Sequence, residues 1–162
     1  MITYRPGAAF AFSHPAHAVA LGFGAGLAPY APGTAGTLVA WAAGLALGSL
    51  VHSPVLLALL AALFALGVWA CALTGEHLGV HDHGAMVWDE IVAFLLVLAI
   101  VPGGLAWQAA GFVLFRIFDI AKPPPIRWLE KRYRGGFGVM LDDLVAAGFT
   151  LLVLAIVKRV FF

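Results

Sequence analysis

Residues 86–122 read MVWDEIVAFLLVLAIVPGGLAWQAAGFVLFRIFDIAK, and this stretch decides the fold. It holds two apolar segments, 86–101 and 105–120, joined by the uncharged turn Pro102-Gly103-Gly104, with ionisable residues only toward the outer ends. Other parts of the chain carry similar apolar segments, at 36–51, 54–73 and 144–157. The pattern predicts an all-α, polytopic membrane helical bundle with about five short transmembrane helices.

The composition supports a bilayer as the solvent. Of 162 residues, 63% are hydrophobic and only 10% are charged, and the mean hydropathy is +1.01. A soluble core of this size could not hide so much apolar surface, so lipid must cover the remainder. We expect a single membrane-embedded domain over residues 1–162 and no nucleic-acid partner. The oligomeric state stays open.

The turns between the apolar segments are of two alternating kinds. His52-Ser53-Pro54 and Pro102-Gly103-Gly104 are short and uncharged, whereas residues 74–85 and 119–143 hold most of the acids and bases. Alternate turns lie on opposite faces of a membrane, and five Lys or Arg residues in 119–143 make that face cytoplasmic. The apolar stretch 16–28 is short and glycine-rich, so we expect a half-inserted or interfacial helix there; a full crossing would raise the count to six.

Carboxylates stand at the ends of apolar segments, where a negative charge is costly unless it is paired or bound to a metal. They could be simple interfacial caps, but together they predict a site made of Asp89, Glu90, Asp119, Asp142 and Asp143. Oxygen donors from separate helix ends suit Mg²⁺ or Mn²⁺, and we expect Mg²⁺; the single cysteine, Cys71, offers no zinc set. Neighbours on a helix point about 100° apart, so not every acid need be a ligand.

Arg116, Asp119 and Lys122 follow i, i+3, i+6 spacing, which places them near one helix face until Pro123 ends the helix. Two interpretations remain open. The three residues could form an intrahelical salt-bridge ladder. Alternatively, Arg116 and Lys122 could hold a phosphate whose charge the acids would otherwise repel, and this is the interpretation we prefer.

Residues 32–37, Pro-Gly-Thr-Ala-Gly-Thr, precede an apolar helix. Gly33, Thr34 and Thr37 therefore offer backbone N–H groups and hydroxyls at the positive end of a helix dipole, where anions bind. We expect them to contact a substrate phosphate. The same residue types also make an ordinary helix start.

His81, Asp82 and His83 lie in a short polar loop before Asp89. No HExxH helix is present, and consecutive residues rarely converge on one zinc ion. We expect a supporting role behind the metal ligands or in proton transfer; the alternative is an ordinary loop. His14, His17 and His52 are expected at the membrane interface.

Four stretches occur in order along the chain: APGTAGTL at 31–38, TGEHLGVHDHGAMVWDE at 74–90, FRIFDIAKPPPIRWLE at 115–130 and GGFGVMLDDLVAAG at 135–148. In this order and spacing, over about residues 21–148, the chain resembles bacterial phosphatidylglycerophosphatase A. One departure is Ala93, where the family often has glycine, and a small residue is kept. The resemblance implies Mg²⁺-dependent removal of the terminal phosphate of phosphatidylglycerophosphate, in phospholipid biosynthesis at the bacterial inner membrane.

No cysteine stands in a phosphate-binding loop, so attack by water fits better than a phosphoenzyme. The competing function is an ion-coupled transporter or channel, whose intramembrane acids would line a path without chemistry. Transport favours polar residues at mid-membrane or on both faces, whereas these acids gather near one face. The identity of the general base, the number of metal ions and the acyl-chain preference stay open.

Overall fold

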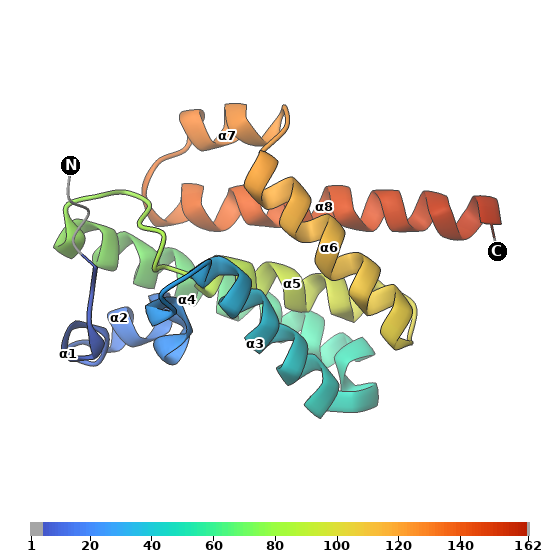
Figure 1. The fold of residues 1–162 in the computed structure, drawn as a ribbon, viewed down its shortest axis with the longest axis horizontal. Coiled ribbons are helices and arrows are strands. Elements are labelled where there is room, and N and C mark those ends of the chain that lie inside the picture. Colours follow the sequence, from blue (N-terminus) through green and yellow to red (C-terminus); the bar gives the residue numbers. More distant parts are fainter. Residues whose placement is uncertain (1–4, 162) are drawn as a thin grey trace.

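The computed structural model describes residues 5–161, and all regular secondary structure in that range is helical, which confirms the all-α prediction (Figure 1). The N-terminal part holds the short helices α1, α2 and η1, and the rest holds five longer helices with two short ones between them. The bounds are α1 Ala8–Ala11, α2 Pro15–Ala20, η1 Gly22–Leu27, α3 Pro32–Leu47, η2 Gly48–His52, α4 Pro54–Leu78, α5 Trp88–Ile100, α6 Leu105–Ala121, α7 Ile126–Arg132 and α8 Gly135–Phe161.

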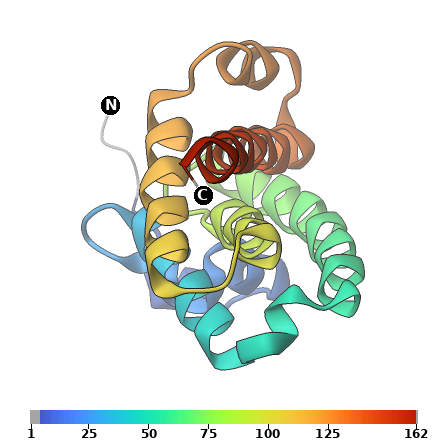
Figure 2. The ribbon, with the colours of Figure 1, turned by 90° about the vertical axis from the view of Figure 1, so that its right-hand side faces the viewer.

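Helix α5 is the centre of the bundle. It packs against α3, α4, α6 and α8, and Figure 2 shows it enclosed by them. Eleven of its thirteen residues are buried, so the helix has no wide face turned to the surroundings. A helix that is apolar all round and covered by other helices is typical of a membrane-bundle interior. The position of α5 therefore fixes where the polar residues at its start must lie.

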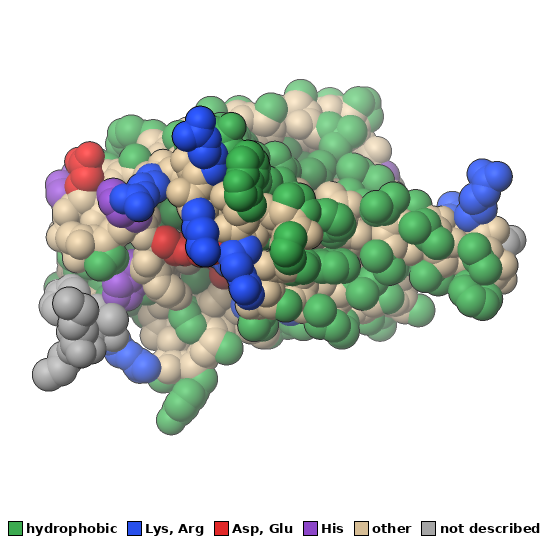
Figure 3. Space-filling view, turned by 90° about the horizontal axis from the view of Figure 1, so that it is seen from above, with side chains coloured by type: hydrophobic (Ala, Val, Ile, Leu, Met, Phe, Trp, Pro, Cys, Tyr) green, Lys and Arg blue, Asp and Glu red, His purple; other side chains and the backbone are tan. Residues whose placement is uncertain are grey.

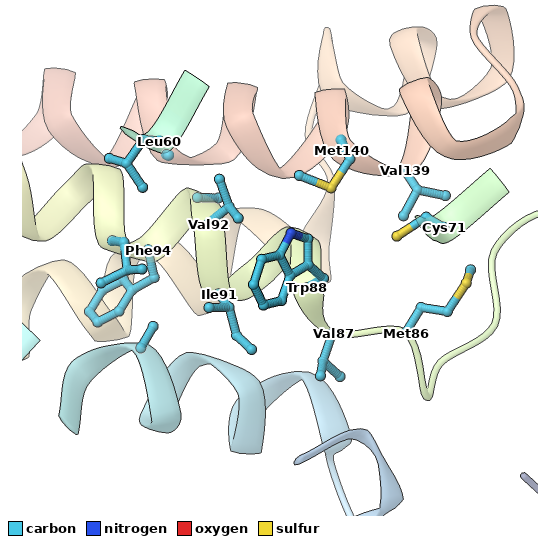
Figure 4. Close-up of a cluster of buried hydrophobic side chains, with 14 of the residues drawn as sticks. Leu60, Cys71, Met86, Val87, Trp88, Ile91, Val92, Phe94, Val139 and Met140 are labelled. Carbon is cyan, nitrogen blue, oxygen red and sulfur yellow. The ribbon is translucent and has the colours of Figure 1, made fainter. Parts of the chain in front are cut away.

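The core near the start of α5 is built around Trp88 and Met140 (Figure 4). The indole Nε1 of Trp88 donates a hydrogen bond to the backbone oxygen of Leu63 at 3.1 Å, which ties α5 to α4. Gly67 of α4 lies against both Trp88 and Met140, and a β-carbon there would overlap them. Because α4, α5 and α8 approach so closely here, the first turn of α5 is held firmly in place.

Three stretches among the described residues are long and apolar enough to cross a membrane: Pro32–His52, Pro54–Leu78 and Gly135–Phe161. The predicted segments 86–101 and 105–120 do form helices, but α5 has 13 residues and α6 has 17. At 1.5 Å per residue these helices are about 20 and 25 Å long, less than the roughly 30 Å of a bilayer core.

The structure differs from the sequence prediction at 16–28, where one half-inserted or interfacial helix was expected. The chain forms α2 and then η1, with a kink at Phe23 and Gly24, whose φ angles are +53° and +107°. Gly22 also has a positive φ, +57°. Backbone in this region cannot continue an α-helix, so the segment folds back on the bundle instead of lying as one rod.

The charged stretch 119–143 is mostly helical and is not the loop that its composition suggested. It holds the end of α6, the whole of α7 and the start of α8. Helix α8 begins at Gly135, nine residues before the predicted apolar segment, so Asp142 and Asp143 lie inside it and are buried. The cause is close packing: Gly136 lies against the backbone of α4 at Val68 and Ala72.

We predict that Gly136→Ala lowers the melting temperature of the purified protein in detergent, although alanine favours helix formation over glycine by about 1 kcal/mol. The added β-carbon would overlap the Val68 backbone oxygen, and such overpacking typically costs about 1–3 kcal/mol. The matched control on the same helix is Gly148→Ala, where no atom lies within 4 Å of the new carbon. Equal melting temperatures for the two variants would contradict the close α4–α8 contact.

Candidate metal and phosphate site

Three buried carboxylates from two helices meet in the interior. Asp89 and Glu90 stand in the first turn of α5, and Asp143 comes from α8. One oxygen from each lies within 4.8 Å of the others, which is a spacing that can hold a metal ion. The start of α5 also favours negative charge, because its free N–H groups carry the positive end of the helix dipole.

Each of these carboxylates has an oxygen without a hydrogen-bond partner among the described residues. The atoms are Asp89 Oδ1, Glu90 Oε2 and Asp143 Oδ2, all inaccessible to solvent. A buried carboxylate oxygen with no partner is strongly unfavourable, so a native protein rarely keeps three together. A divalent cation would satisfy them. These three acids, Asp89, Glu90 and Asp143, are called the carboxylate triad below.

The other two predicted acids lie beside the triad but are engaged by cations. Asp142 precedes Asp143 on α8, and its Oδ2 lies 2.5 Å from Lys122 Nζ, while its Oδ1 accepts a hydrogen bond from the Asp143 backbone N–H. Asp119 on α6 pairs with Arg116. Adjacent residues on a helix point in different directions, so Asp142 faces Lys122 while Asp143 faces the other two acids of the triad.

Arg116 links three helices. Its Nη1 lies 2.7 Å from Asp119 Oδ2 on α6 and 3.5 Å from Glu90 Oε1 on α5, and it donates to Thr37 Oγ1 on α3 at 3.4 Å. The intrahelical Arg116–Asp119 salt bridge considered in the sequence analysis is therefore present. The Nε of Arg116 is buried without a partner in the described part of the chain, so the guanidinium keeps a free donor next to the triad.

Lys122 ends α6 in a left-handed conformation, with φ of +40°, and does not pair with Asp119. Its Nζ lies between Asp142 and Glu130, which is 3.0 Å away on α7. Burial alone would lower the pKa of Lys122, but the hydrogen bonds and charges of Asp142 and Glu130 outweigh it and raise the pKa, so the ammonium stays charged. Glu130 was not predicted as a site residue, because the path of the chain after the three prolines 123–125 cannot be read from the sequence.

The first turn of α3 lies against Arg116 and Glu90. A β-carbon on Gly33 would overlap Glu90 Oε1 and press on the Arg116 guanidinium, so only glycine leaves room for this pair. Thr37 donates its hydroxyl proton to the Gly33 oxygen at 2.8 Å and accepts from Arg116. Thr34 lines a separate groove, together with Arg116 and apolar residues of α6. Residues 32–37, expected to precede the helix, are therefore its first residues, and Arg116 is their main contact with the site.

His81, Asp82 and His83 lie outside the triad. His81 and Asp82 are exposed, and they line a pocket of about 270 Å³ together with Asp142 and Glu130. The ring of His83 accepts a hydrogen bond from the Ala85 backbone N–H at 3.1 Å. His81 and Asp82 thus lie near Asp142, at the Lys122 end of the site.

His17 was expected at the interface, but it is buried. Its Nδ1 lies 3.1 Å from Thr74 Oγ1, and its Nε2 lies 3.0 Å from His77 Nδ1. Burial first, and then the neighbouring His77 and His14, lower the pKa of His17, so it stays neutral more readily than an exposed histidine. This cluster joins α2 to α4, and neither helix contributes an acid to the triad.

Basic side chains gather on one face beside the site. Figure 3 shows Lys and Arg side chains grouped around α7 with carboxylates between them, while hydrophobic side chains cover much of the other visible surface. The exposed members of this group are Arg127, Lys131, Arg132 and Arg134. The charged end and the apolar remainder fit a membrane protein whose polar site lies near one end of its helices.

The sequence profile of the family described as phosphatidylglycerophosphatase A matches residues 18–158, which contain the triad, both cations and the first turn of α3. The chain belongs to this family. The phosphatidylglycerophosphatase A of Haemophilus influenzae is 46% identical over 142 residues, covering 86% of each chain. That of Escherichia coli is 44% identical over 138 residues, covering 83% of this chain and 78% of its own.

A more distant relative carries another substrate name. A Bacteroides thetaiotaomicron protein, provisionally named a phosphatidylinositol-3-phosphatase, is 39% identical over 149 residues, covering 88% of this chain and 92% of its own. Both names describe removal of a phosphate from a phospholipid headgroup. No solved structure matches the chain.

We predict that Asp142→Asn lowers the melting temperature more than Glu130→Gln does. Both carboxylates pair with Lys122, but Asp142 is buried and Glu130 is exposed. The Asp142 side chain is 5% exposed and that of Glu130 is 42% exposed. Breaking a buried pair costs about 3–5 kcal/mol, whereas an exposed pair contributes about 0–1 kcal/mol. Thermal unfolding in detergent measures both, and an equal or larger loss for Glu130→Gln would contradict the assignment.

Proposed function

We propose that this chain hydrolyses phosphatidylglycerophosphate to phosphatidylglycerol and phosphate, as the names of its relatives imply. The observation that carries the proposal is the carboxylate triad, whose three unpartnered oxygens lie next to the Arg116 guanidinium. Carboxylates and an arginine together suit a phosphomonoester and a divalent cation. A transporter or channel would not account for this arrangement in a chain so similar to two phosphatases.

The donor set fits Mg²⁺. Asp89, Glu90 and Asp143 supply hard oxygen ligands of the kind that Mg²⁺ prefers, and no sulfur or imidazole atom is among them. Within residues 5–161, the ion pairs of the five acids come from two side-chain cations, Arg116 and Lys122, so a further positive charge would make the burial of the acids less costly. A bound Mg²⁺ would supply a Lewis acid at the phosphate ester.

The protein's own groups would bind the substrate phosphate and move the protons. Arg116 and Lys122 hold the phosphate, Thr34 lines the groove beside Arg116, and the buried Gly33 and Thr37 lie against the guanidinium. Water attacks phosphorus, the ester P–O bond breaks, and the glycerol oxygen leaves as an alcohol after gaining a proton. One of the acids accepts the proton that water loses, and Asp119 and Asp142 are candidates because they lie beside the triad and outside the set that would hold the metal.

We further propose that α5 and α6 also cross the bilayer, giving five crossings in the bacterial inner membrane, with the site on the cytoplasmic side. Both helices are apolar, and the uncharged turn at residues 102–104 joins them to each other. The basic group around α7 stands at the opposite end of α6 from this turn. The excess of Lys and Arg favours the cytoplasm for that end.

Cysteine labelling tests this topology. In intact cells, a cysteine introduced by Arg132→Cys should not react with an impermeant thiol reagent, whereas one introduced by Gly103→Cys should react from outside. Both positions are exposed, and the native Cys71 is buried. Reaction at position 132 before the cells are opened would overturn the proposed orientation.

Phosphate release from purified protein tests the reaction itself. We expect release from phosphatidylglycerophosphate that requires Mg²⁺ and exceeds release from phosphatidylinositol 3-phosphate. Asp89→Asn and Asp143→Asn should each lower kcat/KM by more than about 100-fold, because loss of even a supporting group behind a metal ligand costs about 10–100-fold. Glu76→Gln, at an exposed acid of α4, is the control. Full activity in an Asn variant would remove that acid from the site.

The two interpretations of Arg116 make different kinetic predictions. If the planar guanidinium binds the phosphate through two N–H groups, Arg116→Lys should lower kcat/KM at least about tenfold, since lysine keeps the charge but loses the bidentate geometry. Lys122→Ala should also weaken catalysis. If both variants fold correctly and keep normal kinetics, the ion pairs with Asp119 and Asp142 are only structural.

A further inference from the structure

An apolar groove runs along the outer side of α6 and reaches the first turn of α3. Its volume is about 470 Å³, and its lining includes Phe112, Val113, Ile117 and Ile120 of α6. Val113, Ile117 and Ile120 are 55%, 52% and 71% exposed, so they face whatever surrounds the bundle. In a bilayer these surroundings are lipid.

The groove ends at the charged site. Its lining is apolar except for Thr34 and Arg116, and the same Arg116 guanidinium contacts Glu90 and Asp119. Residues 113, 117 and 120 recur at helical spacing, whereas Arg116 and Asp119 lie on the neighbouring face of α6. One helix therefore carries an apolar, lipid-facing stripe and, next to it, the cation proposed to bind phosphate.

We propose that this groove holds an acyl chain of the phospholipid substrate, so that the headgroup reaches Arg116 sideways from the bilayer. This rests on the proposed function and adds a lipid-binding subsite to it. The occupant follows from chemistry: a ligand here needs a long apolar part along α6 and an anionic part at Arg116. A phospholipid with a phosphorylated headgroup has both parts, joined in that order.

The first test locates the chain of a bound lipid without relying on turnover. Phosphatidylglycerophosphate with a diazirine in one acyl chain is photolysed with the detergent-purified protein, and labelled peptides are identified by mass spectrometry. We expect labelling within residues 112–121 that unlabelled phosphatidylglycerophosphate suppresses, and weaker labelling around the exposed Leu152 of α8 that it does not. Equal, uncompeted labelling of both regions would mean an ordinary lipid-facing surface and would overturn the proposal.

The second test blocks the groove. Ile117→Trp and Val113→Trp each add bulk to its lining, and Leu152→Trp is the control on an exposed position of another helix. With the acylated substrate, we expect kcat/KM to fall at least about tenfold for both groove variants, within the range for misfit in an apolar pocket. With the deacylated headgroup, glycerophosphoglycerophosphate, their activity should stay within about twofold of wild type, and the control should change neither.

Failure of the acyl-chain subsite and failure of the proposed phosphatase reaction give different results in these tests. Groove variants that match Leu152→Trp on the acylated substrate, or that lose activity equally on both substrates, contradict the acyl-chain assignment. If the wild-type protein releases phosphate from neither compound, the proposed reaction fails, and the competed labelling pattern alone then decides whether the groove binds a lipid chain. If a peptide or a second copy of the chain suppresses the labelling of residues 112–121 and unlabelled lipid does not, the acyl-chain assignment is also wrong.

Discussion

The burial of Asp89 and Glu90 at the start of α5 is the constraint on which the rest of the structure depends. Helix α5 is enclosed by four others, so two adjacent carboxylates enter the interior wherever that helix begins. Buried charge is tolerated only when it is paired, hydrogen-bonded or bound to a metal. Arg116 of α6 pairs with Glu90, and Asp143 of α8 joins Asp89 and Glu90 in a group of carboxylates that can hold a cation.

Two cations then connect the helices around the triad. Arg116 joins α6 to α5 and α3, and Lys122 joins the end of α6 to α7 and α8. Each ion pair is a structural link that also places a positive group beside the acids. Structural and phosphate-binding roles therefore need not exclude each other, because a cation held by carboxylates is preorganised for an anionic ligand. The absence of a side chain at Gly33 makes the Glu90–Arg116 contact possible.

Helix α6 explains how a site with so many charges could serve a substrate dissolved in a membrane. One of its faces carries Arg116 and Asp119 toward the triad, and the adjoining stripe carries exposed aliphatic side chains. A phospholipid has the same division into charged and apolar parts. The proposed substrate, phosphatidylglycerophosphate, has that division, with its phosphate placed at Arg116.

The sequence by itself determined the helical class, the central apolar segments and the set of acids and cations, because hydropathy and charge are local properties read along the chain. The ordered stretches around Gly33, Asp89, Arg116 and Asp142 also sufficed for the family resemblance, which the comparisons confirm. Only the tertiary structure decided which groups meet. Asp143 joins the triad while Asp142 pairs with Lys122, and Lys122 also pairs with Glu130. His17 is buried, and α8 begins at Gly135. These outcomes depend on close contacts between segments that are distant in the sequence. The start of α8, for example, packs through Gly136 against the backbone of α4, and no periodicity within either segment encodes that contact.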